Sequence, residues 1–304
     1  MGTEPQRDTE SLRGSRRSNR RLPRRAASRR RSFNATLKAL DELAASGARV
    51  SVRIDDLDRD TAVLAGDDFV MLPIGGVGIV PLLIEVAAGF ESGALDPLEI
   101  IERSAVAPVE VAGVWQHLKA PALPLIDIVV LAAATGDAIA ANVLTHRVGL
   151  PAVRARIEGL SLTHLALLDQ FRDRRGPDDA PQVALGSTRD LAQLFAGLVN
   201  STVVSASVSA QVAEWLSFNH DLSLVASVTG LDPFSHENDE HGLLFINKTG
   251  RDAGIRAEAG VIAGPRAGVS YAIIVCFDDL SIMHRVRAHE AFRMLGLELM
   301  EYVF

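Results

Sequence analysis

The sequence has a single cysteine, Cys276, among its 304 residues, so no disulfide can form within one chain. It also has no run of about 18 or more uninterrupted apolar residues, the length that a membrane-spanning helix requires. Both observations predict a cytoplasmic protein with no membrane span. Cys276 lies in an apolar stretch and is expected to be a small buried hydrophobe.

Acidic residues are scarce in the first 32 residues, where eleven arginines face three carboxylates and give a net charge of +8. The whole chain has a net charge of −7, so residues 33–304 carry −15. This leader has no apolar run, so the Arg16–Arg17 pair lacks the h-region of a twin-arginine export signal. We expect residues 1–32 to be a basic, disordered leader, or sequence upstream of the true start. The alternative is a segment that docks on nucleic acid or another acidic partner.

The rest of the chain has the composition of a globular protein, since 48% of all residues are apolar and 23% are charged. Hydrophobic periodicity predicts a helix at 34–46, a β-hairpin at 50–65, helices at 80–90, 125–134, 137–148 and 188–199, strands at 242–248, 255–263 and 269–277, and a closing helix at 281–304. The hairpin and the late strands would form one five-stranded antiparallel sheet with flanking helices. Residues from about 76 to 220 would form an all-helical lobe, with a cleft between the lobes.

Four short strings carry the strongest signal. They are Pro73–Leu83 (PIGGVGIVPLL), Gly113–Leu118 (GVWQHL), Gly136–Asn142 (GDAIAAN) and Lys248–Gly250 (KTG). In their order and spacing they resemble class A β-lactamases and related penicillin-recognising serine hydrolases. The resemblance covers about residues 33–304 and implies an α+β, β-lactamase-like fold. It also implies that an acyl-transfer site would lie between the lobes.

The reacting groups of such an enzyme are missing at the matching positions. The resemblance places the serine nucleophile at Gly76, and the lysine that helps to remove its proton at Ile79, one helical turn later. Glycine has no side chain to acylate, and isoleucine cannot transfer a proton. Shifting the alignment does not help, because no Ser, Thr, Cys or Lys lies between Thr61 and Ser92.

The second motif and the following loop are altered in the same way. Gly136 stands in place of the family's proton-shuttling serine and Ala138 in place of its asparagine. Asp137 matches, and is either part of a ligand site or the N-cap of a helix that begins at Ala138. The loop has no counterpart of the deacylating glutamate. Its Asp169 and Asp173 either approach the cleft or are solvated acids paired with arginines.

Lys248, Thr249 and Gly250 match the strand that, in this family, forms part of the site for the substrate carboxylate. With Arg256 or Arg251 nearby, they could form a cationic site for an anion. The alternative is a set of inherited strand residues with no binding role.

Other candidates are weaker. Gly75–Gly78 opens a helix and could direct backbone N–H groups at an anion, but it matches neither a dinucleotide nor a phosphate-loop fingerprint. His236 and His241 have acidic residues between them but lack a regular metal spacing, so a solvated loop is expected. His117 and His146 have no visible nucleophile partner. We therefore expect no metal and no cofactor.

These observations predict a catalytically inactive, β-lactamase-like protein that keeps its cleft for a small anionic or peptidic ligand or for a protein partner. Loss of a single member of a catalytic unit already removes most of the rate, and here the nucleophile, base and shuttle are all absent. The alternative is a related hydrolase that acts on β-lactam, acyl or peptide substrates with relocated catalytic groups. A third hypothesis is a structural or regulatory protein whose basic leader docks on an acidic partner.

Overall fold

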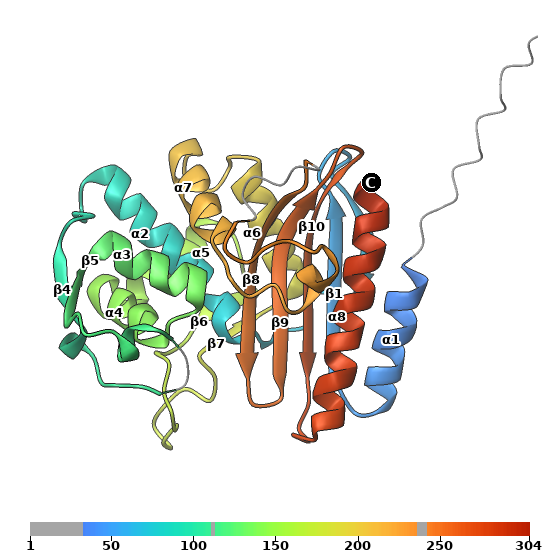
Figure 1. The fold of residues 1–304 in the computed structure, drawn as a ribbon, viewed down its shortest axis with the longest axis horizontal. Coiled ribbons are helices and arrows are strands. Elements are labelled where there is room, and N and C mark those ends of the chain that lie inside the picture. Colours follow the sequence, from blue (N-terminus) through green and yellow to red (C-terminus); the bar gives the residue numbers. More distant parts are fainter. Residues whose placement is uncertain (1–32, 111–112, 236–241) are drawn as a thin grey trace, which may run out of the picture. The chain divides into compact units, whose positions relative to one another are not determined.

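The computed structural model describes residues 33–110, 113–235 and 242–304, which belong to one unit. The basic leader and the His236/His241 pair lie outside the described residues. The unit contains a five-stranded antiparallel sheet with the order β2-β1-β10-β9-β8 (Figure 1). Its strands are β1 (Arg49–Asp56), β2 (Thr61–Gly66), β8 (Leu244–Asp252), β9 (Ile255–Ala263) and β10 (Gly268–Cys276). The sheet predicted from both ends of the chain is confirmed.

The edge strand β8 is longer than the sequence predicted. It was expected to end at Lys248, but it continues to Asp252, which pairs with Ile255 across a tight turn. Within this register Lys248 lies opposite Ala259, and Thr249 lies opposite Glu258. Because side chains alternate along a strand, those of Lys248 and Thr249 point to opposite faces of the sheet.

Two terminal helices, α1 (Asn34–Ala45) and α8 (Ile282–Val303), lie side by side over one face of the sheet (Figure 1). Their buried side chains meet the sheet in one hydrophobic cluster that includes Leu40, Phe292 and Leu299. Each fully buried side chain of this size stabilises the fold by about 1.5–3 kcal/mol. The terminal segments therefore close the sheet on the side away from the cleft.

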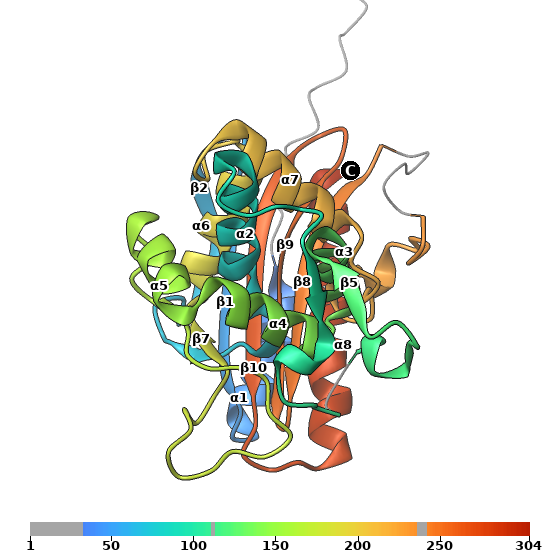
Figure 2. The same cartoon turned by 90° about the vertical axis from the view of Figure 1, so that its left-hand side faces the viewer.

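The other face of the sheet packs against the helical lobe, which stands in front of the sheet in Figure 2. Its helices are α2 (Val80–Ser92), α3 (Leu125–Val130), α4 (Ala138–Val148), α5 (Leu150–Gly159), α6 (Thr188–Val199) and α7 (Ala206–Ser217). Two small sheets join it, one of β3 (Leu72–Pro73), β7 (Ala184–Gly186) and β6 (Leu165–Leu167), the other of β4 (Ile100–Glu102) and β5 (Ala122–Pro124). Helices α5 and α7 were not predicted from the sequence.

Helix α2 is the central helix of this lobe. Pro81 stands in its first turn, and Gly93 ends it in the left-handed conformation. Within the part of the chain that is described, the helical stretch Gly75–Ser92 is long and apolar enough, by length and composition alone, to cross a membrane. In this fold 61% of it is buried inside the protein, as is usual for a helix that is apolar all round.

Candidate functional site

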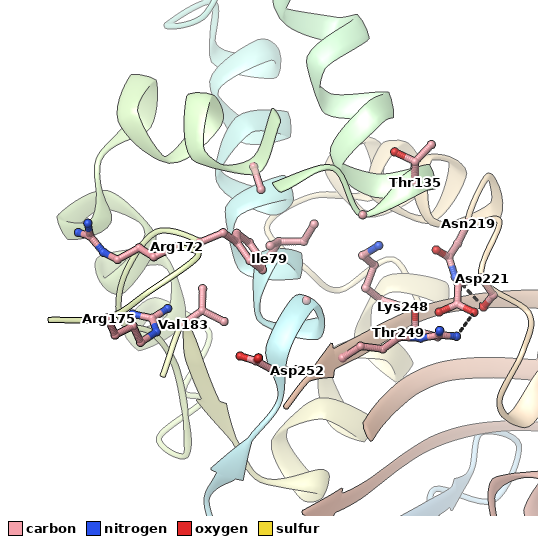
Figure 3. A pocket seen from close by; sticks show the side chains of 15 residues that line it. Ile79, Thr135, Arg172, Arg175, Val183, Asn219, Asp221, Lys248, Thr249 and Asp252 are labelled. Carbon is pink, nitrogen blue, oxygen red and sulfur yellow. Dashed lines mark hydrogen bonds and ion pairs between the residues drawn. The ribbon is translucent and has the colours of Figure 1, made fainter. Parts of the chain in front are cut away.

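A cavity of about 180 Å³ lies between β8 and the helical lobe (Figure 3). It is lined by the 3-10 turn Gly75–Ile79 before α2, the α3–α4 junction, the loop after β6, the segment after α7, and the end of β8. This arrangement brings together Gly76, Ile79, Gly136, Lys248 and Thr249, which are far apart in the sequence. The cleft expected between the lobes is therefore present.

Glycines allow β8 to pack closely on the turn before α2. A Cβ atom on Gly76 would lie 3.1 Å from the carbonyl oxygen of Thr249, and one on Gly250 would collide with the carbonyl oxygen of Ile74. The close approach of the β8 backbone to the turn before α2 is thus sufficient to explain why glycine stands at both positions. A side chain at residue 76 would also require β8 to shift by a few tenths of an ångström.

Lys248 places a buried cation at the cavity. Its side chain is 1% exposed, and Nζ donates a hydrogen bond to the carbonyl oxygen of Ala133 at 2.9 Å. That carbonyl belongs to a single π-helical turn, Leu131–Thr135, which ends α3 at Gly136. Burial lowers the pKa of the Lys248 ammonium to about 8, although the charge of Asp221 opposes this effect. In Figure 3 the side chain extends from β8 toward the α3–α4 junction.

Gly136 leaves space next to this ammonium. It has φ +65°, and a Cβ atom there would lie 3.8 Å from Lys248 Nζ. The resemblance places the proton-shuttling serine at this position, so the missing hydroxyl would have been a neighbour of the ammonium.

Asp221 is a residue of the site that the sequence analysis did not identify. Arg251 donates to its carboxylate at 2.7 Å (Figure 3). The Ser223 hydroxyl also donates to it, at 2.8 Å. Burial raises the pKa of Asp221, but the Thr249 hydrogen bond, the charge of Arg251 and the Ser223 bonds lower it more, so it lies below its usual range. Thr249 and Arg251 therefore already hold an internal carboxylate. No sequence pattern marks Asp221, because it lies in an irregular segment.

Of the two arginines expected near Lys248, Arg251 lines the cavity, whereas Arg256 does not. It shares a face of β9 with Glu258, whereas Ala257 and Ala259 face the helical lobe. Its Nη1 donates to the carbonyl oxygens of Asp252 and Ile255. The side chain lines a different cavity, near the start of α8.

Asp137 acts as the N-cap of α4. Its Oδ1 accepts from the backbone N–H of Ala140 at 2.8 Å, and its Oδ2 accepts from those of Val114 and Trp115, both at 2.7 Å. The side chain is fully buried, and Ala138 beside it is buried in the first turn. These contacts match the capping alternative and connect α4 to the segment at residues 113–115.

We expect Asp137→Ala to lower the free energy of unfolding by about 3 kcal/mol, because it removes the cap and leaves the buried Trp115 N–H and the partly buried Val114 N–H without an acceptor. Urea denaturation measures this loss. Asp127→Ala is the matched control, since Asp127 is an exposed acid on the neighbouring helix. A loss at Asp137 no larger than at Asp127 would contradict the structural role.

The loop after β6, where the resemblance would place a glutamate, lines the cavity with Arg172 and Arg175. Both arginines donate to Asp169, at 2.9 and 2.8 Å. Burial raises the pKa of Asp169, but the hydrogen bonds and charge of the two arginines lower it below its usual range. Asp173 instead accepts from the backbone N–H of Glu110 at 2.8 Å. Neither acid lines the cavity.

The other sequence candidates lie away from the cavity. His117 ends a 3-10 turn, and His146 lies in the last turn of α4. Cys276 is buried, and burial raises the pKa of its thiol to about 11. Among residues 33–110, 113–235 and 242–304, no group of three or more His, Cys, Asp or Glu is placed to hold a metal ion.

Comparisons with known proteins agree with this geometry. The sequence model of the β-lactamase enzyme family matches residues 32–303. No curated protein matches the chain. A β-lactamase from Sphaerobacter thermophilus has a similar structure, with a TM-score of 0.76 and 19% identity over 90% of this chain and 97% of that chain.

Two further structures are similar at lower scores. A PBP-A variant in an acyl-enzyme complex with penicillin G has a TM-score of 0.71 and 17% identity, covering 88% of this chain and 97% of that chain. A β-lactamase from Xanthomonas campestris has a TM-score of 0.71 and 16% identity, covering 90% of this chain and 98% of that chain. The structural likeness shows the shared fold, and the family model covers almost all of residues 33–304. The chain belongs to the β-lactamase enzyme family.

Proposed function

We propose that this protein is a catalytically inactive member of the family that binds a ligand non-covalently in the cleft. One observation carries the proposal. The cavity keeps the buried cation of Lys248 but presents Gly76, Ile79 and Gly136 where the nucleophile, the base and the shuttle would lie. Among the described residues that line it, there is no serine, cysteine, histidine or glutamate.

The two hydroxyl groups at the described cavity wall do not replace the lost serine. Thr135 donates its hydroxyl to the carbonyl oxygen of Leu131 at 2.8 Å, within its own helical turn. The Thr249 hydroxyl bonds to Asp221, whose pKa is lowered. A carboxylate with a lowered pKa that is also paired with Arg251 is a poor general base. This arrangement favours binding over the alternative of a hydrolase with relocated groups.

The cavity fits a small ligand, or the end of a peptide, that carries a hydrogen-bond acceptor with negative charge. One Lys248 donor goes to Ala133, which leaves ammonium N–H groups for an acceptor in the space next to Gly136. Phe171 and Val183 supply apolar surface, and Arg172 and Arg175 line the wall formed by the loop with their guanidinium groups paired to Asp169. A buried ammonium is unfavourable for folding, and such groups cluster at functional sites.

A covalent route is tested by intact-protein mass spectrometry after incubation with a penicillin. The expected spectrum shows the unmodified mass, because no acylable side chain stands at residue 76. An active class A β-lactamase treated in parallel is the positive control. A stoichiometric adduct would overturn the proposal and favour the hydrolase.

Binding is tested by a thermal-shift screen of small carboxylates and acyl peptides. We expect a ligand that stabilises the wild type to bind Lys248→Met at least tenfold more weakly, a loss of about 1.4 kcal/mol or more. Lys38→Met is the matched control, because Lys38 lies on α1 with its side chain 79% exposed. Equal affinity for Lys248→Met would place the ligand outside the cleft.

A further inference from the structure

We propose that a second cavity, at the start of α8, binds a small oxyanion, either a carboxylate or a phosphate group of an organic ligand. This cavity has a volume of about 190 Å³. Its walls are the β8–β9 turn, Phe277 just after β10, and the first turn of α8. It is separate from the cleft, although Asp252 lines both cavities.

Arg256 brings a cation without a direct carboxylate partner to this cavity. Its Nη1 donates to the carbonyl oxygens of Asp252 at 3.1 Å and Ile255 at 2.6 Å, and no carboxylate of the described chain forms an ion pair with it. Its Nε is buried and has no hydrogen-bond partner within the described protein. A buried N–H group without an acceptor is unfavourable for the fold, and an anion bound by the rest of the guanidinium would offset part of that cost.

Arg285 adds a second cation at the same wall. It is exposed on the first turns of α8 and makes no ion pair with any carboxylate in the described ranges. Burial lowers the pKa of Arg256, and the positive charges of Arg251 and Arg285 lower it further, against the opposing charges of Asp221 and Asp252. Burial and the charges of Arg256, Arg251 and Arg285 lower the pKa of His289, on the next turn of α8, although the charge of Asp221 opposes this effect. These neighbouring cations repel one another, and an anion between Arg256 and Arg285 would relieve the repulsion.

His284 provides a second buried polar atom at this wall. Its Nε2 lies 3.1 Å from Asp279 Oδ2, whereas its Nδ1 is buried and has no hydrogen-bond partner among the described residues. The ring packs on Phe277, with 4.7 Å between ring centroids. Phe277 and Leu280 give the cavity an apolar side, so the ligand would join an oxyanion to an apolar group.

The two acids of the cavity are engaged by local groups. Asp252 accepts from the backbone N–H of Ala253 at 2.7 Å. Asp279 accepts from the N–H of Ser281 at 2.9 Å, and its other oxygen faces His284. Neither forms an ion pair with Arg256 or Arg285. Their charge disfavours highly charged anions and favours a single small oxyanion.

Titration of the full chain with inorganic phosphate and, separately, with acetate tests the proposal. Ionic strength is held constant with sodium chloride, and binding is followed by NMR shifts of backbone amides. We expect saturable shifts at the first turn of α8, and an affinity at least fivefold weaker in Arg285→Ala. Because Arg285 is exposed, this variant should fold, and Arg256→Gln should weaken binding at least tenfold. Tighter phosphate binding identifies a phosphate ligand, and tighter acetate binding identifies a carboxylate.

Two control variants separate this site from other surfaces. Arg287→Ala removes an exposed arginine of α8 that does not line the cavity, and it should leave the affinity unchanged. Lys248→Met should also leave it unchanged, so failure of the cleft proposal would not affect this result. Non-saturable shifts, or equal affinities for the wild type, Arg285→Ala and Arg256→Gln, would show adventitious ion binding and overturn the proposal.

Discussion

Replacing Lys248 with methionine is expected to stabilise the protein by about 2 kcal/mol at pH 7. The fully buried ammonium has a pKa of about 8 in place of 10.5, so the fold binds its proton more weakly than the unfolded chain does. That difference destabilises the charged state by about 3 kcal/mol. Methionine has a similar length without the charge, and loss of the hydrogen bond to Ala133 offsets about 1 kcal/mol of the gain.

The pH dependence of stability provides a second readout for Lys248. Between pH 8 and 10.5 the unfolded chain binds more protons at this residue than the folded protein does, so the contribution of Lys248 to stability rises with pH. It is complete above the unfolded pKa and is lost as the pH falls through about 8. Urea denaturation across this window should therefore show a steeper rise for the wild type than for Lys248→Met. Equal slopes, or a destabilised variant, would show that the ammonium is not unfavourable here.

Replacing Glu258 with alanine is expected to lower the free energy of unfolding by at least about 3 kcal/mol. Glu258 is fully buried on the far side of β9. Its carboxyl group accepts from the Tyr271 hydroxyl at 2.7 Å, the Asn247 amide at 2.8 Å and the Val225 backbone N–H at 2.9 Å. Alanine would leave these three buried donors without an acceptor, at about 1 kcal/mol or more each.

Urea denaturation measures this loss, with Glu290→Ala as the control because Glu290 is an exposed glutamate of α8. The control should change stability by about 0.5 kcal/mol or less. Burial raises the pKa of Glu258 to about 7, although its three hydrogen bonds oppose the shift. Its contribution to stability is therefore complete below pH 4.5, its ordinary pKa, and is lost as the pH rises through about 7. A loss below about 1 kcal/mol in Glu258→Ala would contradict this account.

The hydrogen bonds of Glu258 also connect to the wall of the cleft. Asn247, which donates to Glu258, accepts from the side chain of Asn219 at 2.7 Å, and Asn219 lines the cavity. This chain of hydrogen bonds runs through β8, from the face covered by α1 and α8 to the wall next to Asp221. Asn247 and Glu258 are 11 residues apart in the sequence, and the pairing of β8 with β9 brings them together.

Local sequence patterns predicted most of the fold. The alternation in β1 and the apolar runs of β9 and β10 gave their bounds to within one or two residues, because each pattern matches the strand period. Helix α6 begins where Ser187 offers an N-cap, and Ser187 accepts from the N–H of Asp190. The end of β8 was missed because Lys248–Asp252 is polar, and pairing with β9 keeps it extended despite that composition.

The sequence by itself determined what the site lacks. Gly76 and Ile79 carry neither a hydroxyl nor an amine, and no Ser, Thr, Cys or Lys lies between Thr61 and Ser92, so folding of that segment cannot supply one. The tertiary structure decided what the site contains. Strand alternation and the β8–β9 register direct Arg256 away from Lys248, and an irregular segment brings Asp221 to Arg251 and Thr249. Such contacts depend on strand pairing and on packing between distant segments, which no local pattern of residues specifies.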